Sequence, residues 1–140
     1  MSSDIQKVNE LWTDIYYALR YDHKEKMTHQ QIRVLQAVDK EREVGVKEIA
    51  QAINTSQNTA SEHVKRLIEK RYISKVRSKD DERKVLVELT EEGKLTLHRH
   101  TSLDEAKLET ILQSLKPEQT QLVLTALTML KDEAANVHNR

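Results

Sequence analysis

Residues 49–68 read IAQAINTSQNTASEHVKRLI, and this stretch decides the fold. Residues 46–53 make about two turns of amphipathic helix, and the Asn-Thr-Ser turn at 54–56 supplies a left-handed-tolerant residue and two capping hydroxyls. A second helix follows from Gln57 to about residue 70, with apolar residues at helical spacing on one side only. If the short helix packs across that side, the polar front of the second helix stays free to enter the major groove of DNA. The pattern predicts a helix-turn-helix.

The polar front of the second helix suits DNA recognition. The candidate recognition residues are Thr55, Ser56, Gln57, Asn58, Thr59, Ser61, Glu62, Lys65 and Arg66. Within this set the amides Gln57 and Asn58 can pair with adenine and Glu62 can accept from cytosine, whereas the hydroxyls before the helix and the cations further along suit phosphate. The alternative is a polar face that is solvated and has no function.

A short basic hairpin is predicted directly after this helix. The apolar period changes from 3.6 to 2, so residues 72–77 and 84–89 are expected to be strands, separated by the polar residues 78–83. The segment 65–84 contains nine basic and four acidic residues, a net charge of +5 in a chain whose total is zero. Such a segment can aim a positive face at phosphates while the acidic remainder disfavours indiscriminate binding. On charge alone, a solvated surface explains the segment equally well.

The hairpin and the residues after it carry a family pattern. Residues 79–93, KDDERKVLVELTEEG, resemble the wing of the multiple antibiotic resistance regulator (MarR) family, whose pattern is Asp-x-Arg, alternating strand residues, then Leu-Thr-x-x-Gly. The matching residues are Asp81, Arg83, Leu89, Thr90 and Gly93. The resemblance implies a recognition helix at 56–66, a wing tip at Arg83 and dimerisation through the terminal helices. The wing residues expected at DNA are Arg77, Lys79, Asp81, Arg83 and Lys84.

The Asp-x-Arg pair has a physical interpretation of its own. A carboxylate two residues before an arginine can hold the guanidinium outward, where the negative potential of a narrow minor groove attracts it. The alternative is a surface ion pair worth about 0–1 kcal/mol.

One residue departs from the family pattern. Arg71 stands where the family commonly has glycine after the recognition helix. Either Arg71 is left-handed, at a cost of roughly 1–2 kcal/mol, or the helix ends differently and the angle of the wing changes. An additional cation beside DNA could compensate for the cost.

Helices are expected on both sides of this motif. Apolar stripes predict helices at 5–19 and, capped by Thr28, at 29–40. A short extended segment, counted as a strand, is expected at 43–46. One long helix, or two broken near 101–102, is expected after Thr90, and a last helix is expected to begin at Pro117. The expected fold is mainly α with a small β-hairpin, a winged helix-turn-helix flanked by N- and C-terminal dimerisation helices. The expected parts of one protomer are residues 1–27 (N-terminal dimerisation helix), 28–89 (winged helix-turn-helix lobe) and 90–140 (C-terminal dimerisation helices). Because the terminal stripes lack partners within a small protomer, a homodimer is expected.

Several classes of protein are disfavoured. The chain contains no cysteine, which excludes disulfides and thiolate metal sites. No apolar run reaches the roughly 18 residues of a membrane span and no signal peptide precedes the first helix, so we expect a soluble cytoplasmic protein without a membrane partner. Phosphate-binding glycine loops, a His-Glu-x-x-His motif and a nucleophile elbow are absent, so neither an enzyme nor a cofactor is expected.

The predicted function is sequence-specific binding of double-stranded DNA by a homodimeric transcriptional regulator, a repressor, on a pseudo-palindromic operator. A phenolic small molecule is a candidate effector, because such ligands are common in the resembled family and Trp12, Tyr16, Tyr17 and Tyr21 lie near the first helix. Helical spacing favours core or dimer packing for these four aromatic residues.

Two alternatives to this function stay open. One is a zinc-responsive regulator of the same fold, although residues 98 and 100, both histidines, lie on different sides of a helix and cannot bind one ion as a pair. No metal is therefore assigned to the predicted site. The other alternative is a helical protein-interaction module that does not bind DNA.

Overall fold

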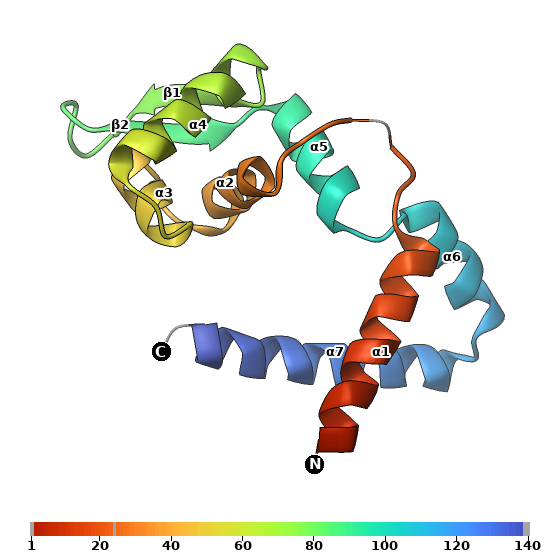
Figure 1. Ribbon diagram of the computed structural model, residues 1–140. Coiled ribbons are helices and arrows are strands. Elements are labelled where there is room, and N and C mark those ends of the chain that lie inside the picture. Colours follow the sequence, from red (N-terminus) through yellow and green to blue (C-terminus); the bar gives the residue numbers. More distant parts are fainter. Residues whose placement is uncertain (1, 24, 139–140) are drawn as a thin grey trace. The chain divides into compact units, whose positions relative to one another are not determined.

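The computed structural model describes residues 2–23 and 25–138 (Figure 1), which contain seven helices and one antiparallel hairpin. The elements in chain order are α1 (Ser2–Leu19), α2 (His29–Lys40), α3 (Val46–Ala52), α4 (Gln57–Glu69), β1 (Ile73–Arg77), β2 (Val85–Leu89), α5 (Glu91–Thr101), α6 (Glu105–Ser114) and α7 (Pro117–His138). The predicted fold class, mainly α with a small hairpin, is confirmed.

The chain divides into two compact units. The central unit runs from Arg20 to Ser102, and the terminal unit combines the chain up to Leu19 with the chain from Leu103 onward. The central unit is longer at both ends than the predicted lobe at 28–89. Its first residues are tied to α5, because Thr96 and Arg99 both donate hydrogen bonds to the carboxylate of Glu25, at 3.1 and 2.5 Å.

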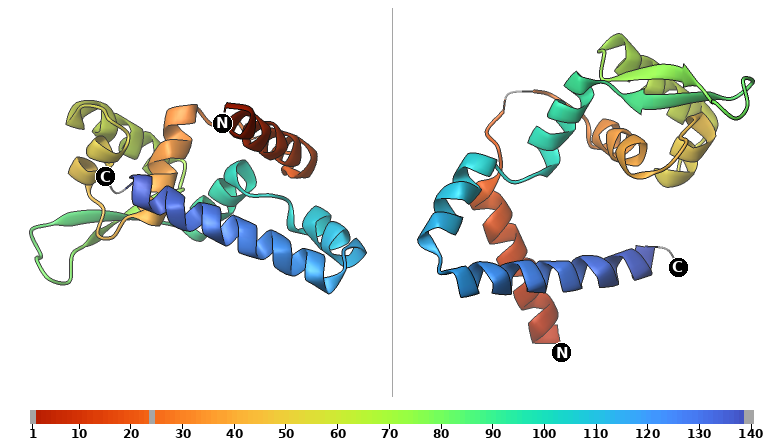
Figure 2. Two further views of the ribbon diagram at one scale, coloured as in Figure 1. Left: turned by 90° about the horizontal axis from the view of Figure 1, so that it is seen from below. Right: turned by 180° about the vertical axis from the view of Figure 1, so that it is seen from behind.

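The central unit has its own hydrophobic core, to which α2, α3, α4, both strands and α5 contribute. The buried residues are Val34, Leu35, Val38, Val44, Ile49, Ala50, Ile53, Ala60, Val64, Leu67, Ile73, Val87 and Leu97. The strands pair from Ile73 opposite Leu89 to Arg77 opposite Val85. Both views of Figure 2 show the loop of the hairpin extending beyond the helices of this unit. The hairpin therefore projects from the packed helices of the central unit.

Side-chain caps explain where the helices begin. Thr28 accepts from Gln31 N at 3.1 Å while the Gln31 amide oxygen accepts from Thr28 N, a reciprocal capping box before α2. Thr90 caps α5 by a single bond, in which its Oγ1 accepts from Gly93 N at 3.0 Å. Pro117 opens α7, where its missing N–H costs no helical hydrogen bond. These starts agree with the sequence predictions.

Two connections between elements could be defined only from the structure. The predicted extended segment at 43–46 is not a strand: α3 already begins at Val46, and the backbone before it makes a single bond to the hairpin, from Val87 N to Val44 O at 2.7 Å. After α5 the helix ends at Thr101 and a new one begins after Asp104, whose carboxylate accepts from Ala106 N and Lys107 N. Of the two alternatives for 91–115, two helices is the correct one.

The terminal unit lacks a core of its own. None of the residues that the structure describes in α1, α6 and α7 is buried. Leu11, Trp12, Leu122 and Leu130 are between 52% and 69% exposed. Two uncovered apolar stripes on long helices are therefore the main feature of this unit. Across the described part of the chain, no helix combines the length and the apolar character needed to cross a bilayer.

Candidate nucleic-acid interface

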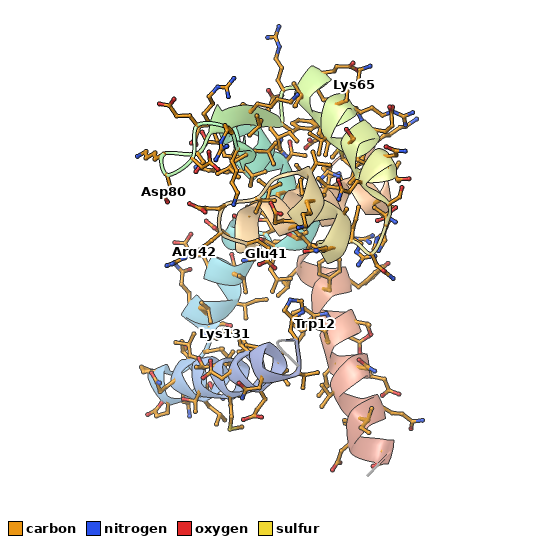
Figure 3. All side chains as sticks on the ribbon, turned by 90° about the vertical axis from the view of Figure 1, so that its left-hand side faces the viewer. Trp12, Glu41, Arg42, Lys65, Asp80 and Lys131 are labelled. Atoms are coloured by element: carbon orange, nitrogen blue, oxygen red, sulfur yellow. The ribbon has the colours of Figure 1, made fainter. Side chains whose placement is uncertain are left out.

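Helix α4 has one buried side and one exposed polar side. Ala60, Val64 and Leu67 are at most 2% exposed and face the core. All nine predicted recognition residues lie at the surface, with Thr55 half-buried and the others exposed. Figure 3 shows Lys65 on the outer side of α4. The structure therefore brings the predicted residues together on one accessible face.

The start of α4 is fixed by the turn before it. Asn54 has a φ of 55°, the left-handed conformation that this residue type tolerates. Ser56 Oγ accepts from Thr59 N at 3.1 Å and donates to Thr59 Oγ1 at 3.0 Å. The hydroxyl of Ser56 is thus used as a cap, and Gln57 and Asn58 occupy the first exposed turn.

The loop of the hairpin is held by a buried serine that the sequence analysis did not single out. Ser78 is 5% exposed, and its Oγ accepts from Asp80 N at 3.2 Å and from Asp81 N at 3.3 Å. Ser78 N donates to Lys84 O, which closes the loop. Figure 3 shows Asp80 at the tip. A serine that can hydrogen-bond the backbone two residues further on is the signal that could have indicated this turn.

The charged wing residues take two different roles. Arg83 Nε lies 3.3 Å from Asp81 Oδ1, which also accepts from Arg83 N at 3.0 Å, while the Arg83 side chain stays 93% exposed. The carboxylate holds the arginine outward, as the spacing predicted. Arg77 instead donates to Glu82 O at 2.7 Å and braces the loop. Lys79 and Lys84 are exposed.

A groove of about 720 Å³ separates α4 from β1. Its apolar floor includes Val64, Ile68 and Ile73, and its rim carries both acids and bases. Lys65 stands on the α4 side and Lys75 on the β1 side. The helix front and the hairpin therefore form two walls of one hollow surface.

The junction between α4 and the hairpin is strained and tightly bonded. Arg71 has a φ of 66°, so the first of the two alternatives for this residue holds. Arg71 N donates to Ile68 O at 2.9 Å and Tyr72 N to Leu67 O at 3.0 Å, the pattern of a Schellman turn in which the left-handed residue is usually glycine.

The same junction is tied to the start of α5. Thr90 N donates to Tyr72 O at 3.0 Å and Thr90 Oγ1 donates to Arg71 O at 2.7 Å. Gly93 lies so close that a Cβ there would stand 1.9 Å from Tyr72 O. The family pattern flagged Thr90 and Gly93, but it did not indicate these contacts. We call Arg71, Tyr72, Thr90 and Gly93 the helix–hairpin junction.

The aromatic residues considered for an effector pocket fall in both units. Trp12, Tyr16 and Tyr17 belong to α1 in the terminal unit, where Tyr17 is 74% exposed. Tyr21 belongs to the central unit, and its hydroxyl lies 3.0 Å from His98 Nε2.

Three histidines, His23, His98 and His100, contact neighbouring groups of the central unit. The rings of His23 and His100 are in contact, with centroids 3.9 Å apart and planes tilted by 44°, and His100 Nδ1 lies 2.8 Å from Thr96 O. Within the residues that the structure describes, no three histidine or carboxylate side chains are arranged as ligands for a metal ion. Beside them, the guanidinium of Arg99 lowers the pKa of Glu25 chiefly by hydrogen bonding, against a smaller opposing effect of burial.

Comparisons of the sequence with known proteins give a family. Residues 20–100 match the family described as "Transcriptional regulator SarA/Rot". The HTH-type transcriptional regulator SarZ of Staphylococcus haemolyticus (strain JCSC1435) is 28% identical over 78 residues, which are 56% of this chain and 50% of the relative. The chain thus spans about half the length of the curated relative that it matches.

Solved structures agree with the fold. Tm0710 from Thermotoga maritima superposes with a TM-score of 0.68 at 17% identity, covering 100% of this chain and 99% of its own. S. aureus MepR bound to ethidium bromide gives 0.62 at 18%, covering 95% of both chains, and Streptococcus pneumoniae FabT in complex with DNA gives 0.60 at 23%, covering 95% and 99%. These structural neighbours are MarR-family regulators, which confirms the resemblance at the level of the fold. The matched family consists of transcriptional regulators rather than enzymes, and because its match extends over more than half of the sequence, the chain belongs to the SarA/Rot family of transcriptional regulators.

Proposed function

We propose that the chain binds double-stranded DNA sequence-specifically, with α4 in the major groove and the hairpin at the neighbouring minor groove. The observation that carries this proposal is the division of α4 into a buried side and an exposed polar side next to a hairpin whose Arg83 points outward. Early residues of the recognition helix meet base edges in helix-turn-helix proteins, and here Gln57 and Asn58 occupy that position. Lys65 and Arg66, further along the helix, would contact phosphate.

The protein acts as a homodimer in this proposal. Its terminal unit exposes Ile5, Val8 and Ile15 on α1 and Leu122 and Leu127 on α7, while the central unit buries a full core. Large uncovered apolar stripes in a regulator are best explained by a second copy of the same chain. A symmetric pair would place two α4 helices on half-sites about one helical turn apart on a pseudo-palindrome. Occupation of such an operator would repress transcription.

Selection of bound duplexes from random DNA tests the proposal most directly. The selected site is expected to be a pseudo-palindrome, and the logarithm of affinity for it should fall linearly with the logarithm of salt concentration. A purified protein that stays monomeric, or that shows no preference among duplexes at moderate salt, contradicts the proposal. A protein-interaction module without DNA binding would show neither the site nor the salt dependence.

Two matched variants on α4 separate base contacts from phosphate contacts. Asn58→Ala is expected to cost about 1–3 kcal/mol at one base position and to relax specificity there. Lys65→Ala should weaken binding by a similar factor on every sequence and lower the salt slope by about 0.9 for each lost phosphate contact, or about 1.8 for the two copies in a homodimer. Identical behaviour of the two variants would argue against the assigned orientation of α4.

Release of DNA by a phenolic small molecule extends this proposal. The exposed Trp12 and Tyr17 side chains motivate it, and MepR, a neighbour of similar fold, is solved bound to a small molecule, ethidium bromide. Calorimetry with salicylate, combined with DNA binding in its presence, tests it; no heat and no release would exclude this class. Zinc regulation has weaker support, because the described residues hold no metal-binding group of three, and DNA affinity that ignores both chelator and added zinc would exclude it.

A further inference from the structure

In the helix–hairpin junction, one side chain connects three elements. Thr90 Oγ1 donates to Arg71 O at 2.7 Å and accepts from Gly93 N at 3.0 Å, while Thr90 N donates to Tyr72 O at 3.0 Å. Arg71 and Tyr72 are the two residues of the turn that ends α4 and leads into β1, and Thr90 directly follows β2. One threonine thus connects the end of the recognition helix, the base of the hairpin and the start of α5.

These contacts fix a direction as well as a distance. A hairpin attached to a helix only through one turn could pivot about that turn. The left-handed conformation of Arg71 is disfavoured for a residue with a Cβ, so the turn alone would not hold its own geometry. The second strand is anchored independently at Thr90, so the hairpin is held at both of its ends. Pivoting would break the two hydrogen bonds from Thr90 and would disturb the close packing of Tyr72 O against Gly93.

We infer that Thr90 is a positioning residue for DNA binding: it sets the angle of the hairpin to α4 so that both reach neighbouring grooves at once. The inference rests on the proposed function, and Thr90 itself touches no DNA. Loss of the threonine hydroxyl leaves Arg83 intact at the tip but misplaced relative to α4. Binding energy from Arg83 then falls although the side chain and its bond to Asp81 are unchanged.

A double-mutant cycle between Thr90 and Arg83 tests this inference. Distant sites that share no partner normally contribute additively, and these two residues lie at opposite ends of β2. Thr90→Val and Arg83→Ala are each expected to weaken binding to the selected duplex, by at least about threefold. In the double variant Arg83→Ala should cost at least about threefold less than it does in the wild-type protein. A purely structural role for Thr90 predicts additive effects.

Three further variants keep the result interpretable. Thr90→Ser retains both hydroxyl bonds and should restore the wild-type cost of Arg83→Ala. Thr90→Asp keeps an acceptor for Gly93 N but cannot donate to Arg71 O, so it preserves the cap, folds if Thr90→Val does not, and should still show the coupling. Thr28→Val removes the comparable cap of α2, which has no bond to the junction, and should be additive with Arg83→Ala.

The outcomes distinguish failure of the proposed DNA binding from failure of the positioning role of Thr90. Wild-type protein that selects no duplex overturns the proposed function and this inference with it. Wild-type protein that binds its site, with additive cycles for both Thr90→Val and Thr90→Asp, overturns the inference alone. Coupling in both Thr90 cycles together with additivity for Thr28→Val supports it.

Discussion

The close approach of Gly93 to Tyr72 makes a quantitative prediction. A Cβ on residue 93 would stand 1.9 Å from Tyr72 O and 2.9 Å from Tyr72 C, both backbone atoms. Carbon and oxygen approach to about 3.3 Å at the closest, so Gly93→Ala must move the two segments apart by about 1.4 Å. The backbone cannot swing away as a flexible side chain would, since Tyr72 O also accepts from Thr90 N.

The expected loss follows from three contributions. Overpacking of this kind costs about 1–3 kcal/mol, and weakening one of the junction hydrogen bonds adds about 1 kcal/mol. Alanine is the better helix former in α5 by roughly 0.5–1 kcal/mol, which offsets part of the cost. Gly93→Ala should therefore lower the free energy of unfolding by about 2 kcal/mol.

Urea unfolding followed by circular dichroism measures this change, with Lys94→Ala as the matched control. Lys94 is the next residue of α5, is exposed and forms only a surface ion pair with Glu91 at 3.3 Å. Its replacement should stay within about 0.5 kcal/mol of the wild type. A Gly93→Ala protein as stable as the Lys94→Ala control would refute the close packing of residues 72 and 93.

Three further predictions concern the charged residues Arg71, Glu25 and Arg83. Arg71→Gly relieves the left-handed strain and should raise the free energy of unfolding by about 0.5–1 kcal/mol once the greater flexibility of unfolded glycine is counted; an unchanged value in urea unfolding would contradict the strain. Arg99 lowers the pKa of Glu25 from its ordinary value of 4.5, so the Glu25 carboxylate should stabilise the fold above pH 4.5 and lose this effect as the pH falls below it. In the same assay, Glu25→Gln should be less stable than the wild type at pH 6, and the difference should shrink at lower pH. Arg83→Ala should weaken DNA binding in anisotropy titrations, with a smaller salt slope if the arginine meets phosphate or a relaxed A·T preference if it enters the minor groove; neutral behaviour would reduce its pairing with Asp81 to a surface ion pair.

The sequence predicts α2, α4 and the hairpin well because their boundaries carry local signals. Ser56 and Thr28 are capping residues, and the structure places them at the starts of α4 and α2. The change of period after α4 locates both strands to within one residue. These signals act between residues a few positions apart, so one sequence contains them in full.

Contacts between distant residues are less accessible. Thr90 and Arg71 are nineteen positions apart, and nothing in either residue type announces that one donates to the carbonyl of the other. Arg71 in particular carries the wrong local signal, since glycine is the residue that a left-handed turn prefers. Its conformation accompanies the local bonds of the helix end, Arg71 N to Ile68 O and Tyr72 N to Leu67 O, whereas the bonds from Thr90 form only once β2 has returned to the end of α4.

The terminal helices show a third situation, in which the pattern is correct and its partner is missing. The stripe through Val8, Leu11 and Ile15 predicts an amphipathic helix, and α1 is one, yet these side chains are 43–53% exposed. An apolar stripe indicates that one side of the helix is to be buried, but it does not indicate which surface covers it, because any apolar surface of matching shape would suffice. The central unit satisfies its own stripes and the terminal unit does not. The arrangement of α1 and α7 is therefore expected to depend on a second chain, while the surface proposed to meet DNA is complete in one.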